Sequence, residues 1–221
     1  MKSGHPPVYT IFAKGAAAMV TVGLAGGSGS GKGYLCARLA LHGIPSFDCD
    51  AVYHAMISSD SAVTRELVSV FGEGIRSPEG GIDRTALRAI VFTDGAEDAR
   101  LRLNEITHRH IREACLRWID GMRSEGKEAA VVDAPLLFES GFDRLCDLTV
   151  AVTAPIELRV RRILSRDGIG EDAARRRIAA QISDSELSAR ADLVIENDGD
   201  ATRLSQQIEQ LLHAIRRKHH V

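Results

Sequence analysis

A glycine-rich stretch near the start of the chain, GLAGGSGSGKGY from Gly23 to Tyr34, constrains the fold more than any other part of the sequence. It follows a short apolar run and precedes a leucine-containing helical pattern, so we expect a strand, a tight turn and a helix in succession. Gly26, Gly31 and Lys32 have the G-x-x-x-x-G-K spacing of a phosphate-binding P-loop. There, glycines let backbone N–H groups surround a polyphosphate at the positive end of a helix. A flexible Gly/Ser loop is the competing interpretation, but the lysine and the flanking elements favour a phosphate site.

The position after Lys32 departs from this motif. A serine or threonine usually stands there, and its hydroxyl group ligates Mg²⁺, but this chain has Gly33 followed by Tyr34. The tyrosine hydroxyl lies too far from the backbone to take over that role. The residues that we expect to bind the phosphates of ATP are Gly29, Ser30, Gly31, Lys32, Gly33 and Tyr34. The motif leaves the metal ligands open.

Composition indicates a globular protein and excludes several functions. Of 221 residues, 44% are hydrophobic and 26% are charged, with a formal net charge of −2, so we expect no nucleic-acid partner. No apolar run approaches the roughly 20 residues of a membrane span, so we expect no membrane partner. The four cysteines are far apart and form no C-x-x-C pair, which indicates a reducing, cytoplasmic setting without a zinc site.

Five short apolar runs alternate with helical patterns along the chain. They are Val20–Ala25, Ile44–Phe47, Ala129–Asp133, Leu148–Thr153 and Asp192–Glu196. This alternation predicts an α/β fold with a parallel sheet covered by helices on both faces. We expect one domain at 19–221, with a helical substrate-binding insertion at about 52–126 between the second and third runs. Residues 1–18 lack the long apolar core of a signal peptide, and we expect a disordered extension or a translation start at Met19.

Two aspartates follow the second apolar run, where open α/β sheets bind their ligands. Asp48 and Asp50 are two residues apart, so on strand geometry they point to the same side. Phosphoryl transfer to an alcohol needs an oriented hydroxyl group. We expect Asp50 to accept its proton, and Asp48 to organise the substrate or the metal. An aspartate-rich helix cap is the alternative interpretation.

Further candidates lie later in the chain. Asp133 ends the third apolar run beside the P-loop and could bind Mg²⁺ through water, or could simply belong to the following turn. Arg162 and Arg166 are one helical turn apart and could reach a shared anion, because arginine binds phosphate with paired hydrogen bonds. With the arginine-rich helix that follows, they predict a lid at about 162–190 that closes over ATP, although most of these arginines suit a solvated face. His108 alone is more typical of a structural histidine than of a catalytic one.

These motifs together resemble the dephospho-coenzyme A kinase family over about Val20 to Leu212. The matching segments are GLAGGSGSGK, FDCD, LNEITH ending at His108, VVDAPLLFESG from Val131, RDG at Arg166, RRRIAAQ ending at Gln181 and ADLVIEND with Asn197. The resemblance implies a P-loop kinase fold with a five-stranded parallel sheet, a CoA-binding insertion and a lid. It implies transfer of the ATP γ-phosphate to the 3′-hydroxyl group of dephospho-CoA, the last step of CoA synthesis, with Mg²⁺ as cofactor.

The resemblance also assigns roles to residues. Asp50 matches the catalytic aspartate and Arg166 the lid arginine, and we add Lys32 as the third catalytic residue and Arg162 as an ATP ligand. The implied binding residues are Asp48, His108, Leu136 and Leu137 for dephospho-CoA, and Asn197 for the adenine of ATP.

The chain departs from the family pattern in several places. Gly33-Tyr34 replaces Ser-Thr, Ala25 a threonine, Arg109 a proline, Cys49 an alanine and Arg159 a glutamine. The loss of the hydroxyl group after Lys32 keeps two alternatives open: another small-molecule P-loop kinase, or a non-catalytic nucleotide-binding protein. The retained lysine, paired aspartates and lid argue against a pure binder. The expected assembly is a monomer or a weak homo-oligomer.

Overall fold

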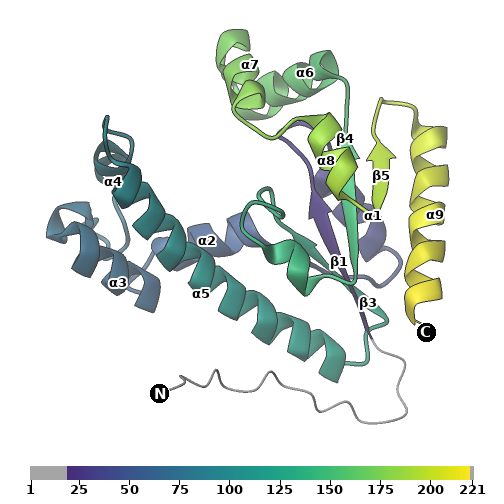
Figure 1. Ribbon diagram of the computed structural model, residues 1–221, viewed down its shortest axis with the longest axis horizontal. Coiled ribbons are helices and arrows are strands. Elements are labelled where there is room, and N and C mark those ends of the chain that lie inside the picture. Colours follow the sequence, from purple (N-terminus) through teal and green to yellow (C-terminus); the bar gives the residue numbers. More distant parts are fainter. Residues whose placement is uncertain (1–18, 220–221) are drawn as a thin grey trace, which may run out of the picture.

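The computed structural model describes residues 19–219, so the disordered extension expected at 1–18 lies outside the described residues. The centre of the fold is a five-stranded parallel sheet with the strand order β2-β3-β1-β4-β5. The strands are β1 (Val20–Ala25), β2 (Ser46–Asp48), β3 (Ala129–Asp133), β4 (Leu148–Thr153) and β5 (Leu193–Glu196). The predicted parallel α/β sheet is confirmed. Because all strands run the same way, their carboxyl ends meet at one edge (Figure 1).

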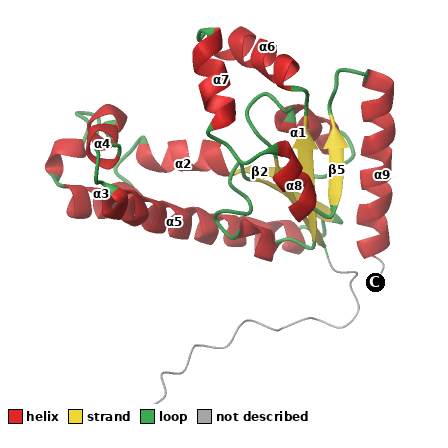
Figure 2. Ribbon diagram, turned by 45° about the horizontal axis from the view of Figure 1, so that its top comes forward, coloured by secondary structure: helices red, strands yellow, loops and turns green. Residues whose placement is uncertain are grey.

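Side chains alternate across each strand and give the sheet two buried faces. On β3, Val131 packs into one apolar cluster and Val132 into the other, and both are completely buried. The first cluster is covered by α1 (Lys32–Ala40) and α9 (Ala201–His219), and the second by α5 (Glu97–Ser124) and α8 (Asp184–Arg190). Figure 2 shows α9 and α5 on different sides of the strands, as the prediction of two covered faces requires.

Between β2 and β3 the chain forms a helical insertion that extends away from the sheet (Figure 1). Its elements are α2 (Cys49–Ile57), α3 (Ala62–Phe71), a 3₁₀ turn (Glu73–Ile75), α4 (Arg84–Val91) and the first half of α5. They enclose an apolar cluster of their own, in which Leu67 and Ile75 are completely buried. The insertion can therefore hold its shape at a distance from the sheet.

After β4 the chain forms a second projection where the lid is predicted (Figure 1). We call α6 (Ile156–Asp167) and α7 (Glu171–Ala179) the lid helices. They pack on each other through a small cluster around Val160, Ile163 and Ala174, which is distinct from the two clusters of the sheet. The chain then returns to the sheet at α8, where Leu187 is completely buried.

Turns and caps complete the fold. A 3₁₀ turn (Phe142–Leu145) places Phe142 in the second sheet cluster. α4 begins after Asp83, whose carboxylate accepts hydrogen bonds from two backbone N–H groups of the first turn at 2.8 and 3.1 Å. Asp200 caps α9 in the same way, at 2.8 and 3.0 Å, and aspartate is one of the residues that helix N-caps favour. Within residues 19–219, no helix combines the length and apolar character that crossing a membrane requires.

Candidate active site

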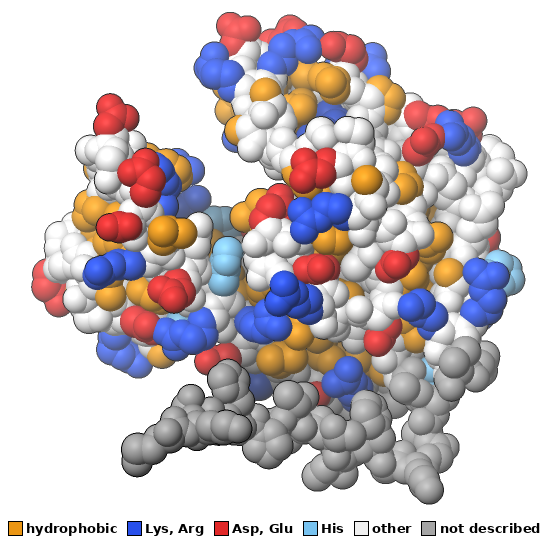
Figure 3. All heavy atoms as spheres, in the orientation of Figure 1, with side chains coloured by type: hydrophobic (Ala, Val, Ile, Leu, Met, Phe, Trp, Pro, Cys, Tyr) orange, Lys and Arg blue, Asp and Glu red, His pale blue; other side chains and the backbone are white. Residues whose placement is uncertain are grey.

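Two adjoining pockets open at the carboxyl edge of the sheet, where the surface is hollowed between the insertion and the lid helices (Figure 3). The first, which we call the phosphate pocket, is lined by the P-loop and by Asp48, Asp133, Arg162 and Arg166. The second, the apolar pocket, has a volume of about 240 Å³ and lies between α2, α5 and the loop after β3. Asp50 lines both pockets, so its carboxylate stands where two ligands would meet.

The P-loop connects β1 to α1 in a backbone conformation that depends on glycine. Gly29 and Gly31 have φ angles of 77° and 102°, in the left-handed region that other residues rarely adopt. A Cβ atom at Gly31 would also lie 2.0 Å from Nδ2 of Asn197. α1 starts at Lys32, so the positive end of its dipole faces the pocket. The predicted succession of a strand, a glycine-rich turn and a helix is confirmed.

Lys32 and Asp133 face each other inside the phosphate pocket. The Lys32 ammonium donates a hydrogen bond to the carbonyl of Gly26 at 2.9 Å and lies 3.7 Å from Oδ1 of Asp133. β3 pairs directly with β1, with Asp133 opposite Leu24, and this pairing brings the carboxylate beside the P-loop as predicted.

Oδ1 of Asp133 is buried and has no hydrogen-bond partner among the residues that the structure describes. Burial raises the pKa of Asp133 above its ordinary value, against the opposing effect of the Lys32 ammonium, and the nearby carboxylates of Asp48 and Asp50 raise it further. An unpartnered buried oxygen of this kind is suited to a water molecule or a cation. Within residues 19–219, no three acidic, histidine or cysteine side chains lie close enough together to hold a metal ion by themselves.

The geometry predicted for Asp48 and Asp50 is wrong, although both residues line the phosphate pocket. The strand β2 ends at Asp48 and α2 begins at Cys49, so Asp50 is helical and the two side chains do not share one side of a strand. Asp48 is the N-cap of α2 and accepts a hydrogen bond from the N–H of Ala51 at 2.9 Å. The cap interpretation therefore describes Asp48, whereas Asp50 in the first helical turn remains available to a ligand.

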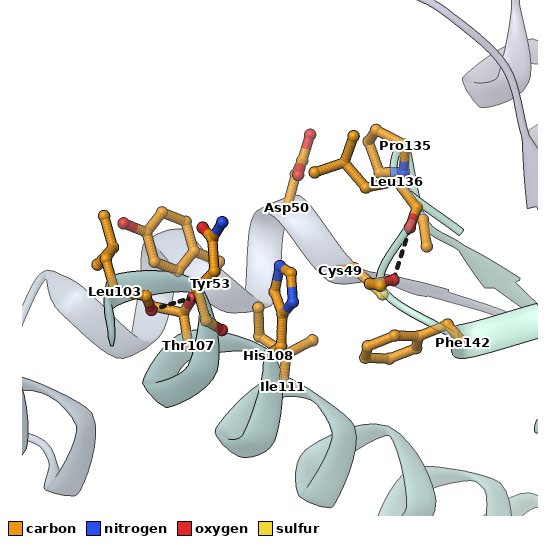
Figure 4. Close-up of a pocket in the computed structure, with 13 residues that line it drawn as sticks. Cys49, Asp50, Tyr53, Leu103, Thr107, His108, Ile111, Pro135, Leu136 and Phe142 are labelled. Atoms are coloured by element: carbon orange, nitrogen blue, oxygen red, sulfur yellow. Dashed lines mark hydrogen bonds between the residues drawn. The ribbon is translucent and has the colours of Figure 1, made fainter. Parts of the chain in front are cut away.

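The apolar pocket lies beside Asp50 (Figure 4). His108 from α5 and Asp50 from α2 point into the same space, and Pro135 and Leu136 lie beside Asp50. Burial lowers the pKa of His108 below its ordinary value, so the imidazole is neutral near pH 7. A neutral imidazole is suited to a hydrogen bond or a stacking contact rather than to an ion pair. Leu136, which is 51% exposed, presents an apolar surface to the same pocket.

Three predicted contact residues lie outside both pockets. Leu137 is completely buried in the sheet core, so its predicted contact with the substrate is corrected to a packing role. Ser30 is also completely buried, and its backbone N–H bonds to the carbonyl of Gly27 at 3.1 Å. The side chain of Asn197 is buried and donates to the carbonyl of Ser30 at 2.8 Å. Ser30 and Asn197 thus form or support the P-loop from behind.

The two predicted arginines differ in their surroundings. Arg162 donates to the carbonyl of Gly29 at 3.0 Å and to Oδ1 of Asn197 at 2.9 Å, so it braces the P-loop while lining the phosphate pocket. Arg166 is held by the neighbouring carboxylate of Asp167, at 2.6 and 3.0 Å, and this pairing raises its pKa. Both arginines line the phosphate pocket, so binding of one anion by both stays a prediction.

The sequence reasoning missed most of the wall of the apolar pocket. Its further members are Cys49, Tyr53, Leu103, Asn104, Thr107, Ile111, Ala134, Ser140 and Phe142. Asn104, Thr107, His108 and Ile111 have the i, i+3, i+4, i+7 spacing of one helical face. Once His108 is assigned to the site, this spacing is the signal that identifies the other three.

Comparison with known proteins identifies one family. A family model described as dephospho-CoA kinase matches residues 20–203. A dephospho-CoA kinase of Corynebacterium efficiens is 38% identical over 197 residues, which cover 89% of this chain and 98% of that protein. The enzyme of the same name from Anaeromyxobacter dehalogenans is 37% identical and is covered to 93%, with 90% of this chain covered.

Solved structures show the same similarity. A Thermus thermophilus protein superimposes with a TM-score of 0.76 at 29% identity, covering 89% of this chain and 97% of that one. The dephospho-CoA kinase of Campylobacter jejuni superimposes with a TM-score of 0.64 at 26% identity, covering 88% of this chain and 96% of that chain.

Proposed function

The chain belongs to the dephospho-CoA kinase family, and from this premise we propose how its residues carry out the reaction. Enzymes of this family use ATP to phosphorylate dephospho-CoA in the last step of CoA synthesis, and this chain is such a kinase. In our proposal ATP places its phosphates in the phosphate pocket, and dephospho-CoA enters the apolar pocket. The observation that carries the proposal is the position of Asp50 on the boundary between the two pockets.

Asp50 is the proposed general base. A hydroxyl group that lies beside it is also next to the terminal phosphate, because its pocket adjoins the P-loop. The carboxylate orients the 3′-hydroxyl group and accepts its proton as the new bond to phosphorus forms. His108, Leu136 and Tyr53 line the acceptor side, and they hold the substrate against Asp50 through apolar and neutral polar contacts.

Lys32 and Arg166 are the proposed sources of positive charge. Negative charge is spread over the phosphate oxygens during transfer, so cations fixed around them stabilise the transition state. Lys32 is held by the P-loop carbonyl of Gly26, which fixes its ammonium before ATP arrives. Arg166 reaches the pocket from a lid helix, so closure of the lid both brings this charge to ATP and excludes water.

The proposed metal is Mg²⁺, and the residues present fit it. The buried, unpartnered oxygen of Asp133 is a hard ligand that can hold the ion directly or through water. When bound, the ion neutralises charge on the ATP phosphates. Asp133 would supply the protein's oxygen ligand, because Gly33 offers no hydroxyl group. We also propose that the reaction takes place in the cytoplasm, since the four cysteines are free, as in proteins of a reducing compartment. The proposed assembly is a monomer or a weak homo-oligomer.

Restoring the hydroxyl group in Gly33→Ser is expected to tighten Mg²⁺ binding. A Cβ atom at Gly33 meets no atom within 4 Å, so serine fits without strain. We expect the Mg²⁺ concentration that half-saturates ATP binding to fall by roughly threefold or more, since one oxygen ligand is added. Calorimetric titration of the enzyme with ATP at several Mg²⁺ concentrations measures this change.

Gly33→Ala is the matched control, because it adds the same Cβ atom without a hydroxyl group. It should leave the metal dependence as in the unchanged enzyme. Equal behaviour of the serine and alanine variants would show that a side chain at this position does not reach the ion, and weaker binding with serine would show a metal site adapted to glycine.

The identity of the phosphate acceptor is tested with purified protein and Mg-ATP, in a coupled assay that measures the release of ADP. We expect dephospho-CoA to be phosphorylated faster than adenosine, gluconate or shikimate, because the apolar pocket suits a large, partly apolar acceptor. A preference for one of the other three would support a different small-molecule kinase. ADP release that no acceptor accelerates would support the non-catalytic alternative.

A further inference from the structure

A polar cluster at the base of the lid helices joins them to the back of the P-loop. Arg159, in the first turn of α6, donates from Nε to the carbonyl of Ser28 at 2.9 Å, from Nη2 to Oε1 of Gln181 at 3.1 Å and from Nη1 to Oδ1 of Asp184 at 3.0 Å. The same Gln181 oxygen accepts a hydrogen bond from the N–H of Ser28 at 2.9 Å. Arg159 and Gln181 therefore hold both backbone polar groups of one P-loop residue.

This cluster is tightly fitted. Arg159 is only 3% exposed, and three of its nitrogen atoms have acceptors. A Cβ atom at Gly27 would lie 2.1 Å from Nη2 of Arg159 and 2.9 Å from Oε1 of Gln181. The guanidinium and amide groups packed on position 27 thus leave room only for glycine. The φ angle of Gly27 is not positive, so backbone conformation does not require glycine there.

The cluster lies at the junction between the lid helices and the rest of the molecule. Arg159 lies near the start of α6, and Gln181 follows the end of α7, so the pair sits where the chain enters and leaves the lid helices. Beyond Gln181, Ile182 and Leu187 pack into the core of the sheet. The lid helices above have their own small cluster (Figure 1). A movement of these helices relative to the sheet would therefore alter the Arg159 and Gln181 contacts that also hold the P-loop.

We propose that Arg159 and Gln181 are positioning residues for the phosphoryl donor. They hold the turn at residues 27–29 in the conformation that receives the phosphates of ATP, and they set the base from which Arg166 reaches the same pocket. Gln181 lines that pocket itself. The effect is one of preorganisation: a P-loop fixed before ATP binds loses less conformational freedom on binding. This proposal rests on ATP as the donor of the proposed function.

A purely structural role would give a different result from a positioning role. Loss of a structural contact lowers the melting temperature and the fraction of active protein but leaves both Michaelis constants unchanged. Loss of a positioning contact at the P-loop raises KM for ATP and spares KM for dephospho-CoA, because the apolar pocket contains neither residue.

The test compares Arg159→Met, Arg159→Gln and Gln181→Leu, with both Michaelis constants and the melting temperature measured for each. We expect Arg159→Met to raise KM for ATP by at least about tenfold, the effect of losing hydrogen bonds from a charged group. Arg159→Gln keeps one donor for the Ser28 carbonyl and should restore part of the affinity. Gln181→Leu should raise KM for ATP by roughly threefold or more. All three should leave KM for dephospho-CoA within about twofold.

Arg175→Met is the matched control. Arg175 lies on α7 and pairs with Glu157 and Glu171. Its side chain is 42% exposed and touches no P-loop residue in these contacts, so both constants should stay unchanged. Folded variants with an unaltered KM for ATP, or with both constants raised equally, would overturn the proposal. If Arg159→Met does not fold, the partly buried Gln181→Leu decides the outcome alone. Phosphorylation of dephospho-CoA by the unchanged enzyme is measured first, so that a failure of the proposed function is seen separately.

Discussion

Replacing Asp50 by asparagine is expected to lower kcat by about a thousandfold while ATP affinity stays within a few fold. The amide is nearly the same size as the carboxylate and keeps a hydrogen-bond acceptor, but it cannot take the proton of the attacking hydroxyl group. We expect ATP affinity to survive because, in the proposed complex, Lys32 and the P-loop backbone supply the positive groups that bind the phosphates, and Asp50 supplies none. Steady-state kinetics with dephospho-CoA, together with binding of ATP to the free enzyme, measure the two effects separately.

Asp98→Asn is the control for this substitution. Asp98 lies in the first turn of α5 as Asp50 lies in the first turn of α2, so both changes remove a charge that favours a helix N-terminus. Only Asp50 lines the pockets, and only its replacement should affect turnover. If Asp50→Asn instead abolishes ATP binding but leaves turnover of the bound complex unchanged, Asp50 is a phosphate-site residue and not the base.

Features encoded in local sequence could be predicted for this chain. The P-loop spacing identified the turn between β1 and α1, and the spacing of five apolar runs identified the parallel sheet. The neighbouring position of Asp133 followed from the usual order of strands around a P-loop. Each of these predictions depends on a few adjacent residues or on a rule that many parallel sheets obey.

Features that depend on distant contacts could not be predicted. β2 has only three residues, and a strand so short leaves no alternating pattern to show that Asp48 is already a cap. Leu136 and Leu137 are adjacent and both apolar, yet only the fold decides that one lines a pocket and the other is buried. Arg159 and Ser28 are 131 positions apart in the sequence, so an arginine-rich helix gives no sign of which arginine turns inward.

Replacing Lys32 by methionine is the second large change, and we expect it to lower kcat/KM by about a thousandfold. Methionine keeps the apolar length of the side chain but removes the cation that is fixed 2.9 Å from the carbonyl of Gly26. The phosphates then meet the carboxylate of Asp133 without the ammonium that lay 3.7 Å from it. Both ATP binding and transfer should weaken, in contrast to Asp50→Asn, since the charge interacts with the phosphates before and during transfer.

Lys218→Met is the matched control, because the ammonium of Lys218 also bonds to a backbone carbonyl, that of Asp147, but far from the phosphate pocket. It should leave the kinetics unchanged.

A double variant of Lys32 and Asp133 tests the role of Asp133. If the two residues act as a pair, Asp133→Asn should restore part of the ATP affinity of Lys32→Met, because it removes the uncompensated negative charge. Additive losses in the double variant would mean that Asp133 serves the metal independently of the lysine, and undiminished activity of Lys32→Met would contradict the assignment of the P-loop itself.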